Sequence, residues 1–334
     1  MLPRAEDVTP DGQLAGESAD TVRRQLDLVE TRLLEASRGR TALVSEKSGH
    51  IISAGGKRFR PLLVLLASHF GAPAAEIDED RLIDAAVVVE LTHVASLYHD
   101  DVMDEAELRR GAPSANSRWG NLQAILIGDL LFARASSVVS ALGTEYVKIQ
   151  ADTFARLVHG QLAETVGPAD GGDPLAHYLQ VVSDKTASLI ATSARFGAMV
   201  SGASAAVVEA LTEFGEVIGT AFQLSDDIID VTSDTTGKVP GIDLREGIPT
   251  LPTLLLGDAA EDLELRAMIA EDLSEDAKLA EVLQRLRAHP VIDKARAEVA
   301  RRADQARALL EPLPPGDSRD ALFALCDQVV TRTS

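Results

Sequence analysis

The segment Leu97-Tyr-His-Asp-Asp-Val-Met-Asp104 ends a long apolar stretch with three aspartates, and it decides how the rest of the chain is interpreted. Apolar side chains before it recur at spacings of three and four, which predicts an α-helix over residues 78–107. On such a helix Asp100 and Asp104 stack on one face, with Asp101 beside them. Carboxylates crowded in this way repel one another and need a compensating cation, and their hard oxygen atoms suit Mg²⁺.

A second segment, Phe222-Gln-Leu-Ser-Asp-Asp-Ile-Ile-Asp230, repeats this spacing at the end of another apolar helix, with Asp226, Asp227 and Asp230. Acids at a helix C-terminus oppose the macrodipole, so a solvated helix end is an unattractive explanation for either cluster. Mg²⁺ binds proteins through one or two carboxylates plus substrate phosphates. Two clusters that face each other across a cavity would therefore hold a diphosphate between several ions.

The rest of the chain shows the same helical periodicity and no convincing alternating strand. The predicted helices cover residues 20–37, 60–70, 78–107, 121–141, 145–166, 174–202, 205–232, 251–270, 275–288, 290–311 and 317–331. Turn-rich loops at 109–117 and 232–250 follow the two aspartate segments directly. Because no repeat or low-complexity linker divides the chain, we expect an all-α, single-domain bundle over residues 21–334 with a central cavity. Residues 1–20 are expected to be loosely ordered.

Composition narrows the possible functions. Residues are 46% hydrophobic but only 4% aromatic, so the core must consist of aliphatic side chains, which favours helices. A net charge of −20 argues against nucleic acid and anionic membranes as partners. The single cysteine, Cys326, excludes an intramolecular disulfide and suggests a cytoplasmic location. We find neither a signal peptide nor an apolar run of about 18 residues, and so expect no membrane span.

Basic residues near these acids are candidates for a second anion site. Ile51-Ile-Ser-Ala-Gly-Gly-Lys-Arg-Phe-Arg-Pro61 joins a Gly-Gly turn to Lys57 and Arg60 at the start of a helix, where anions are favoured. His93 lies two turns before Asp100 on the same helical face. Further candidates near the acids are Arg109, Arg110, Lys185, Thr186 and Lys238. Any single one of these cations is also explained by a surface ion pair.

Taken together, these motifs resemble the trans-isoprenyl diphosphate synthases, a family of all-helical prenyl chain-elongating enzymes. The resemblance covers the chain from about residue 48 to its C-terminus. The matching segments occur in family order: Gly55-Gly-Lys-Arg-Phe-Arg-Pro61, His93, Asp100-Asp-Val-Met-Asp-Glu-Ala-Glu-Leu-Arg-Arg-Gly111, Gly128-Asp129, Lys185-Thr-Ala187, Phe222 to Asp230, and Gly237-Lys-Val-Pro-Gly-Ile-Asp-Leu-Arg-Glu-Gly247.

The resemblance implies roles for these residues. Asp100, Asp101, Asp104, Asp226, Asp227 and Asp230 would bind about two or three Mg²⁺ ions. Arg109, Lys185 and Lys238 would neutralise an allylic diphosphate such as farnesyl or geranylgeranyl diphosphate, with Thr186 and Gln223 nearby. Lys57, Arg60, His93 and Arg110 would hold isopentenyl diphosphate. Of these residues, Asp100, Asp101, Asp104, Lys185, Asp226 and Asp227 would be catalytic, and the enzyme would be a homodimer.

Product length is set, in the family, by residues just before the first aspartate. Here they are Ala95 and Ser96, which are small and lie roughly 6–7.5 Å below Asp100, so the prediction is a long all-trans product of about C30 to C50, used for quinone side chains. The helical wheel alone does not rank the two positions. Phe132 is a candidate for a deeper floor of the product tunnel, although an ordinary core phenylalanine explains it equally well.

Two segments depart from the family pattern. Gly160-Gln-Leu-Ala-Glu164 exchanges the two polar residues of the usual Gly-Glu-x-x-Gln, and Ile248 stands where many members carry Lys before Pro249-Thr250. Three alternatives stay open: a short-chain synthase making geranylgeranyl or farnesyl diphosphate, a class I terpene cyclase, and a non-catalytic subunit of a heteromeric synthase. The complete second cluster argues against the cyclase, and the retention of both clusters argues against the subunit.

Overall fold

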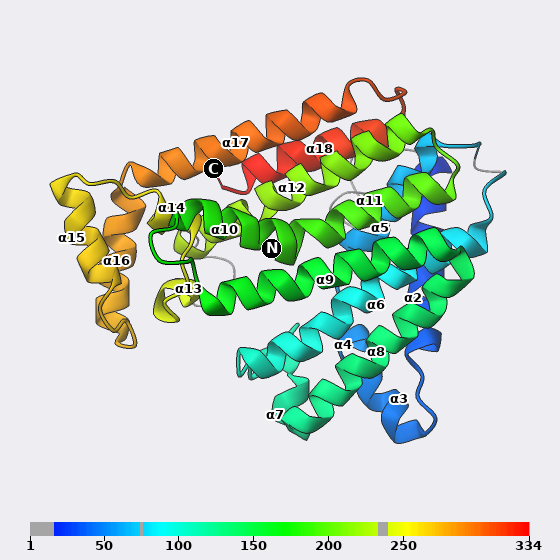
Figure 1. The fold of residues 1–334 in the computed structure, drawn as a ribbon, viewed down its shortest axis with the longest axis horizontal. Helices are drawn as coiled ribbons and strands as arrows, with labels where there is room; N and C mark the ends of the chain where they lie inside the picture. The colour runs from blue at the N-terminus through cyan, green and yellow to red at the C-terminus, as the bar shows by residue number, and fades with distance from the viewer. Residues whose placement is uncertain (1–16, 74–75, 233–239, 334) are drawn as a thin grey trace.

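The computed structural model describes residues 17–73, 76–232 and 240–333, and within them the chain is almost entirely helical (Figure 1). The predicted all-α class is confirmed. The N-terminal half contains α2 (Glu17–Ser37), α3 (Ala42–Ser48), α4 (His50–Ser53), α5 (Phe59–Ala67), the 3₁₀-helix η1 (Ser68–Phe70), α6 (Glu79–Met103), α7 (Ala115–Trp119), α8 (Asn121–Leu142) and α9 (Thr144–Val166). The C-terminal half contains α10 (Pro174–Val182), the π-helix η3 (Ser183–Ala187), α11 (Ser188–Val200), α12 (Ala205–Thr232), α13 (Ile242–Arg245), α14 (Leu251–Leu254), α15 (Ala260–Ile269), α16 (Asp276–Ala288), α17 (Val291–Leu310) and α18 (Asp317–Thr331).

The long helices pack side by side around one core. Helix α6 packs along α8 and α5, and α12 packs between α11 and α17. The buried apolar residues, from Ala19 in α2 to Val329 in α18, form one cluster. The C-terminal ends of α6 and α12 point toward the same end of the bundle, at the left in Figure 1. Both aspartate segments therefore lie at this end.

Helix α6 shows why these sequences form these elements. Its N-cap is Asp78, whose side chain accepts the Arg81 N–H at 3.2 Å. The run Val87-Val-Val89 is a weak helix former, yet all three side chains are buried. Burial against neighbouring helices, rather than intrinsic propensity, therefore stabilises this segment as a helix. The helix ends at Met103, and Asp104 caps it.

Helix boundaries differ from the predictions in three places. The predicted helix 174–202 is interrupted by η3, and the predicted helix 251–270 is split into α14 and α15. The split includes Gly257, whose N–H donates to the Asp262 carboxylate. The short helices α3, α4, α7 and α13 were not predicted, because four to seven residues are too few to show a helical period. Residues 1–16 of the predicted loose segment lie outside the described part, and α2 already begins at Glu17.

A small β-hairpin follows α6, so the prediction of no strand was wrong. Strands β1 (Leu108–Arg109) and β2 (Ala112–Pro113) pair antiparallel, with Leu108 opposite Pro113. The two turn residues, Arg110 (φ 54°) and Gly111 (φ 79°), both have positive φ, as a type I′ turn requires. Two residues per strand are too few for alternation to appear in the sequence. The hairpin fixes the directions of Arg109 and Arg110.

Two described helices are apolar and long enough to span a bilayer by length and composition alone, so the expectation of no such stretch was too strict. In α6, 72% of the apolar window is buried inside the protein, as in a core helix. In α8 only 33% of the window is buried. The exposed apolar face of α8 is considered with the proposed assembly below.

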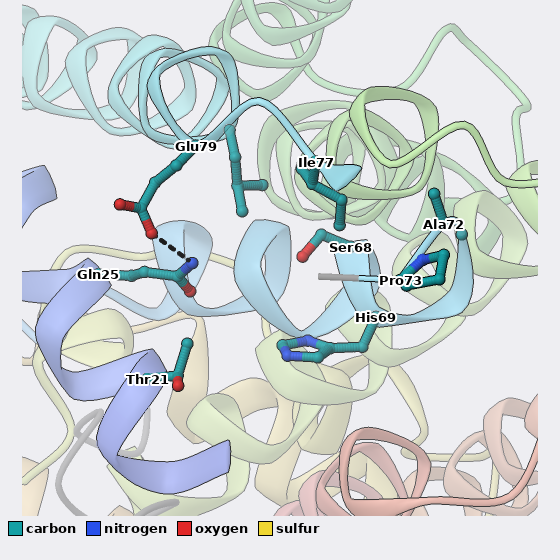
Figure 2. Close-up of a pocket in the computed structure, with 10 residues that line it drawn as sticks. Thr21, Gln25, Ser68, His69, Ala72, Pro73, Ile77 and Glu79 are labelled. Carbon is teal, nitrogen blue, oxygen red and sulfur yellow. Dashed lines mark hydrogen bonds between the residues drawn. The ribbon is translucent and has the colours of Figure 1, made fainter. Parts of the chain in front are cut away.

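A polar cavity of about 270 Å³ lies between α2, η1 and the start of α6 (Figure 2). Gln25 donates to Glu79 at 3.2 Å across it, with Ser68 and His69 on the opposite wall. A wider hollow of about 840 Å³ lies at the N-terminal end of α12, beside Tyr146. No candidate site residue lines either one. The chemistry predicted from the sequence therefore has to be sought at the other end of α6.

Candidate active site

The first aspartate cluster lies at the C-terminal end of α6. Over the second half of this largely buried helix, His93, Ser96, Leu97 and Asp100 keep part of their surface accessible. Their spacing of i, i+3, i+4 and i+7 places them on one face. Asp104 continues this face and caps the helix, because its N–H donates to the Asp100 carbonyl at 2.8 Å. One accessible stripe thus joins the predicted metal ligands to His93.

Asp101 has a different environment from its two neighbours. Its side chain is 0% exposed, and Oδ1 accepts from the Arg109 Nε at 2.6 Å. Its other oxygen, Oδ2, is buried without a hydrogen-bond partner. A buried carboxylate oxygen left unpaired is costly unless a cation or donor satisfies it. Arg109, from the hairpin, therefore neutralises Asp101 while leaving one oxygen available.

Asp100 and Asp104 are short of positive charge. Burial raises the pKa of Asp100 to about 6, while the Lys185 ammonium opposes this rise and the Asp104 carboxylate adds to it. Burial likewise raises the pKa of Asp104, again opposed by Lys185. Glu164, on α9, adds to the rise in both pKa values and forms an ion pair with Lys185. Asp100, Asp104 and Glu164 thus share two cations, Lys185 and Arg109, and this excess of acid stabilises a divalent cation.

The π-helix η3 places Lys185 and Thr186 between the two aspartate clusters. Lys185 faces the first cluster, as its effect on the pKa of Asp100 shows. Thr186 donates to the Gln223 Oε1 at 3.2 Å, on the helix that carries the second cluster. Single π-turns inside helices are frequent at functional sites. The sequence identifies Lys185 and Thr186 as candidates. No pattern in it predicts the π-turn that points one toward the first cluster and the other toward the second.

Gly160 of α9 allows this packing. A Cβ at Gly160 would lie 2.7 Å from the backbone nitrogen of Lys185, closer than real Cβ atoms approach backbone. Alanine normally stabilises a helix relative to glycine by about 1 kcal/mol. Here we expect the opposite: Gly160→Ala should lower the thermal unfolding midpoint, because overpacking costs about 1–3 kcal/mol. Calorimetry checks this, and an unchanged or raised midpoint would contradict the close packing.

The second cluster receives contacts from four other segments: α10, α13, α14 and the end of α18. Asp226 Oδ1 accepts from Arg332, near the C-terminal end of the described chain. Asp230 caps the segment before α13, since its Oδ2 accepts the Asp243 N–H at 3.4 Å and its carbonyl accepts the Gly241 N–H at 3.0 Å. Asp226 thus contacts the end of α18, and Asp230 contacts the N-terminal end of α13. No motif in the sequence pointed to Arg332.

Asp227 is the most enclosed member of the second cluster. Its Oδ2 accepts from the Leu251 N–H at 2.8 Å and from the Tyr178 hydroxyl, and Gln223 donates to Oδ1 at 3.4 Å. Burial nevertheless raises the pKa of Asp227 to about 7, with the Tyr178 hydrogen bond acting against the rise. Asp227 thus joins α10, α12 and α14, and its role as a metal ligand stays a prediction.

The predicted basic residues gather around a buried acid, Glu90, that sequence reasoning missed. Arg60 is buried with its Nε unpartnered, and burial lowers its pKa to about 10. Arg110 donates to the Ile51 carbonyl at 3.1 Å and lies 3.8 Å from Glu90. Burial, and next the charge of Arg60, hold the pKa of His93 well below its usual range. A Glu inside Val87-Val-Val-Glu-Leu91 is the signal that was overlooked.

Arg58 is a second missed residue of this basic group. It donates to Glu90 at 3.0 Å and to Glu30 at 2.6 and 2.7 Å. A Cβ at Gly56 would lie 2.6 Å from the Arg58 Nη1 and 2.7 Å from the Arg110 Nη1, so the glycine leaves space for both guanidinium groups. Lys57 is partly buried beside them. Cations here outnumber the two acids, and this excess of positive charge suits an anion.

The aspartates suit a metal that is shared with phosphates. Within the residues that the structure describes, no three His, Cys, Asp or Glu side chains converge closely enough to hold a metal unaided. The unpartnered Oδ2 of Asp101 and the shortage of positive charge around Asp100 fit a hard divalent cation. Mg²⁺ completes its shell with water and substrate phosphates. The donor set therefore fits Mg²⁺ bound together with a diphosphate.

The candidate chain-length residues fall in two different places. Ser96 lies on the accessible stripe below Asp100, whereas Ala95 is 0% exposed. Phe132 contacts His99, with 5.6 Å between ring centroids, and Phe154 of α9, with 4.3 Å. The structure therefore brings Ser96 to the site and places Ala95 in the core. The role of Phe132 stays a prediction. Lys238 lies outside the described residues.

This all-helical bundle with paired DDxxD helices defines the isoprenoid synthase class. The sequence model of the family described as Polyprenyl synthetase matches residues 41–286. The chain is 47% identical to the nonaprenyl diphosphate synthase of Mycobacterium tuberculosis, over 93% of this chain and 92% of that protein. The chain belongs to the polyprenyl synthetase family and is a prenyltransferase.

Solved structures agree in fold. The geranylgeranyl pyrophosphate synthase of Corynebacterium glutamicum, crystallised with calcium and isoprenyl diphosphate, has a TM-score of 0.86 at 42% identity, covering 96% of this chain and 99% of that one. The decaprenyl diphosphate synthase of Rhodobacter capsulatus has a TM-score of 0.83 at 31% identity, covering 95% and 98%. Synthases of both short and long products thus share this fold, so the fold alone does not fix product length.

Proposed function

We propose that the protein condenses isopentenyl diphosphate with an allylic diphosphate, in the presence of Mg²⁺, to build a long all-trans polyprenyl diphosphate. The observation that carries this is the arrangement of two acidic clusters on either side of Lys185 and Thr186, beside a separate basic group at Arg60 and Arg110. One part of the site suits a metal-bound diphosphate, and the other suits a diphosphate held by cations alone. Two diphosphate substrates match these two parts.

The residues of the chain have separate roles in this reaction. The carboxylates of the two clusters would hold Mg²⁺, which would supply positive charge to the leaving diphosphate when bound. Arg109 and Lys185 add charge beside it, where negative charge develops as the allylic C–O bond breaks and the diphosphate leaves with the electron pair. The terminal alkene carbon of isopentenyl diphosphate forms the new C–C bond, and loss of a proton, with the departed diphosphate as base, restores an alkene. The apolar walls exclude water from the cation.

A long product, of about C30 to C50, is proposed because Ser96, four residues before Asp100 on the accessible stripe, is small, and the stripe carries no aromatic residue between His93 and Asp100. The similarity to a nonaprenyl diphosphate synthase supports this length, and the use of the product as a quinone side chain is part of the proposal. The similarity to a geranylgeranyl pyrophosphate synthase makes a short product the alternative. A non-catalytic subunit remains the remote alternative.

One experiment tests the activity and the product together. Purified protein is incubated with farnesyl diphosphate and labelled isopentenyl diphosphate, with Mg²⁺ or with excess chelator, and product length is measured by chromatography. We expect products of about C30 to C50 with Mg²⁺, no product after chelation, and recovery when Mg²⁺ is restored. Undiminished turnover in chelator would contradict the metal-dependent mechanism. A C15 or C20 end product would contradict the long-chain proposal.

A homodimer is part of the same proposal. Exposed apolar side chains follow one face of α8 and α9: Leu122, Ile125, Leu126, Val147, Val158, Leu162 and Val166. A contiguous apolar face of this kind marks an interaction surface, and a second copy of the chain suits it because a two-fold interface pairs like with like. This partner also accounts for the low burial of α8.

Charge placed in this face should separate the two copies. Leu126 is 56% exposed, and we expect Leu126→Glu to shift the protein from dimer to monomer in size-exclusion chromatography with light scattering. Leu263→Glu is the matched control, since Leu263 is 51% exposed on α15, outside this face. A dimer that survives Leu126→Glu, or a wild-type monomer, would rule this interface out.

A cytoplasmic location is also proposed. Cys326 is buried as a free thiol, and burial raises its pKa to about 12, so it does not act as a reactive or disulfide-forming cysteine. A fold that needs no disulfide is compatible with a reducing compartment. Fractionation of the native host would test the location.

A further inference from the structure

Arg332 reaches the second aspartate cluster from the end of α18. Its backbone is fixed from two sides: its N–H donates to the Gln328 carbonyl at 3.1 Å, and the next carbonyl, of Thr333, accepts from the Arg296 Nε at 2.6 Å. Thr333 itself is buried. The Arg332 side chain is therefore directed into the site by the fold, and its exposed fraction is only 16%.

The Arg332 guanidinium contacts Phe222 and Asp226 of the second aspartate segment, and Phe222 in turn packs on Phe59. The guanidinium lies over the ring of Phe222, 4.4 Å from the centroid, and Phe222 stacks on Phe59 with 6.0 Å between centroids. Nη2 donates to the Asp226 Oδ1, and Nη1 is buried without a hydrogen-bond partner. A cation is attracted by the face of an aromatic ring as well as by a carboxylate. Both interactions thus hold a positive charge at Asp226.

We propose that Arg332 is the internal counter-ion of Asp226 and competes with the divalent metal for its carboxylate, so that it sets the metal affinity of the second cluster. This inference rests on the proposed function, which assigns Asp226 to the metal. The guanidinium occupies one of the two oxygens that a metal would use, and its charge repels a divalent ion nearby. Metal binding at Asp226 therefore requires Arg332 to withdraw, and the free-energy cost weakens this binding.

The chain offers a matched control for this arrangement. Arg307 donates to Asp327 and lies over the ring of Phe323, 5.2 Å from its centroid, on α17 and α18. The same three residue types thus occur in the same relation, away from the two aspartate clusters. Arg307→Gln and Arg332→Gln change the net charge equally. A general effect of charge on metal binding would appear in both variants, and a local effect in only one.

The test measures metal binding directly, without turnover. Mn²⁺ is titrated into protein supplied with inorganic pyrophosphate, with pyrophosphate alone as the blank, and free Mn²⁺ is followed by electron paramagnetic resonance. We expect Arg332→Gln to bind Mn²⁺ roughly tenfold more tightly than wild type, a change of ~1.4 kcal/mol. Arg307→Gln should match wild type. In an Asp226→Asn background, Arg332→Gln should give no gain, because the carboxylate for which the two cations compete is gone.

Each outcome decides the proposal. Unchanged affinity in Arg332→Gln, an equal gain in Arg307→Gln, or a gain that persists with Asp226→Asn would overturn it. Arg332→Lys covers the case in which the glutamine variant does not fold. Lysine keeps the charge but loses the planar stacking, so its affinity for Mn²⁺ should exceed that of wild type by less than tenfold. A lysine variant that binds no more tightly than wild type would then contradict the proposal.

This result is independent of the test of the proposed function. If the enzyme elongates prenyl chains but its Mn²⁺ affinity does not change when Arg332 is replaced, the proposed function stands and this inference is wrong. A protein that makes no prenyl product would lose the proposed function, and the Mn²⁺ titration would still report whether Arg332 competes at Asp226.

Discussion

Replacing Asp100 by asparagine is expected to lower kcat by about 10³-fold, the effect typical of removing a group that stabilises charge in the transition state. Asparagine has nearly the same shape but carries no charge, so it holds a divalent cation far more weakly. The carboxylate lies on the accessible stripe of α6 and responds to Lys185, which places it where the leaving group would be. Diphosphate release under single-turnover conditions measures the loss.

Asp258→Asn is the control for this substitution, because Asp258 is 97% exposed and lies outside the aspartate clusters. Its kcat should equal that of wild type. Activity within a few fold of wild type in Asp100→Asn would show that the first cluster does not carry the chemistry.

Although Asp100→Asn should lose activity, its free energy of unfolding should not decrease. The pKa of Asp100 is about 6 in the folded chain and about 3.9 in an unfolded one. The folded state therefore binds the proton more tightly, and stability falls as pH rises from about 4 to about 6. Above this range the full penalty applies, and asparagine removes it. At pH 8 the variant should melt no lower than wild type in calorimetry; a lower melting temperature would mean that Asp100 stabilises the fold.

Ser96→Phe is expected to change the product from about C30–C50 to about C15–C20. Ser96 lies one turn, roughly 6 Å, below Asp100 on the accessible stripe, so a phenyl ring there would block the path of a growing chain near its start. Diphosphate release from the first condensation should continue, because the ring lies below the reacting groups. Chromatography of the products measures the change.

Ala95→Phe provides the comparison for Ser96→Phe. Ala95 is 0% exposed, and its carbonyl would lie 3.2 Å from a Cβ built on Gly128 of α8. A phenylalanine there should mainly overpack the core, which costs about 1–3 kcal/mol in the free energy of unfolding. If Ala95→Phe shortened the product while Ser96→Phe left it unchanged, the assignment of the accessible stripe as the product path would be wrong.

The sequence predicts the helical class and both aspartate clusters because these depend on local spacing. Asp100 and Asp104 share a face on any regular helix, so their mutual effect on pKa follows from the chain alone. The ranking of Ala95 and Ser96 did not follow, because two adjacent positions differ only in which neighbouring helix covers them. Burial decided this, and burial is a property of the packed helices.

Residues that act across long sequence separations were missed for the same reason. Arg332 and Asp226 are 106 positions apart, and no local pattern joins them. Glu90 was not singled out in the sequence, although an acid among buried valines needs a buried partner such as Arg58. The π-turn at Lys185 depends on the close approach of Gly160 from another helix. Such features come from tertiary packing, which periodicity does not encode.

The β-hairpin after α6, with its two-residue turn, contacts both the first aspartate cluster and the basic group. Arg109 ends β1 and turns toward Asp101, whereas Arg110, the first residue of the turn, has positive φ and turns toward the Ile51 carbonyl. Two adjacent residues of one hairpin thus face the two proposed sites, Arg109 that of the allylic diphosphate and Arg110 that of isopentenyl diphosphate. If Arg109 and Arg110 hold the two substrates as proposed, a shift of this turn would move both substrates together, and the hairpin would set the spacing between them.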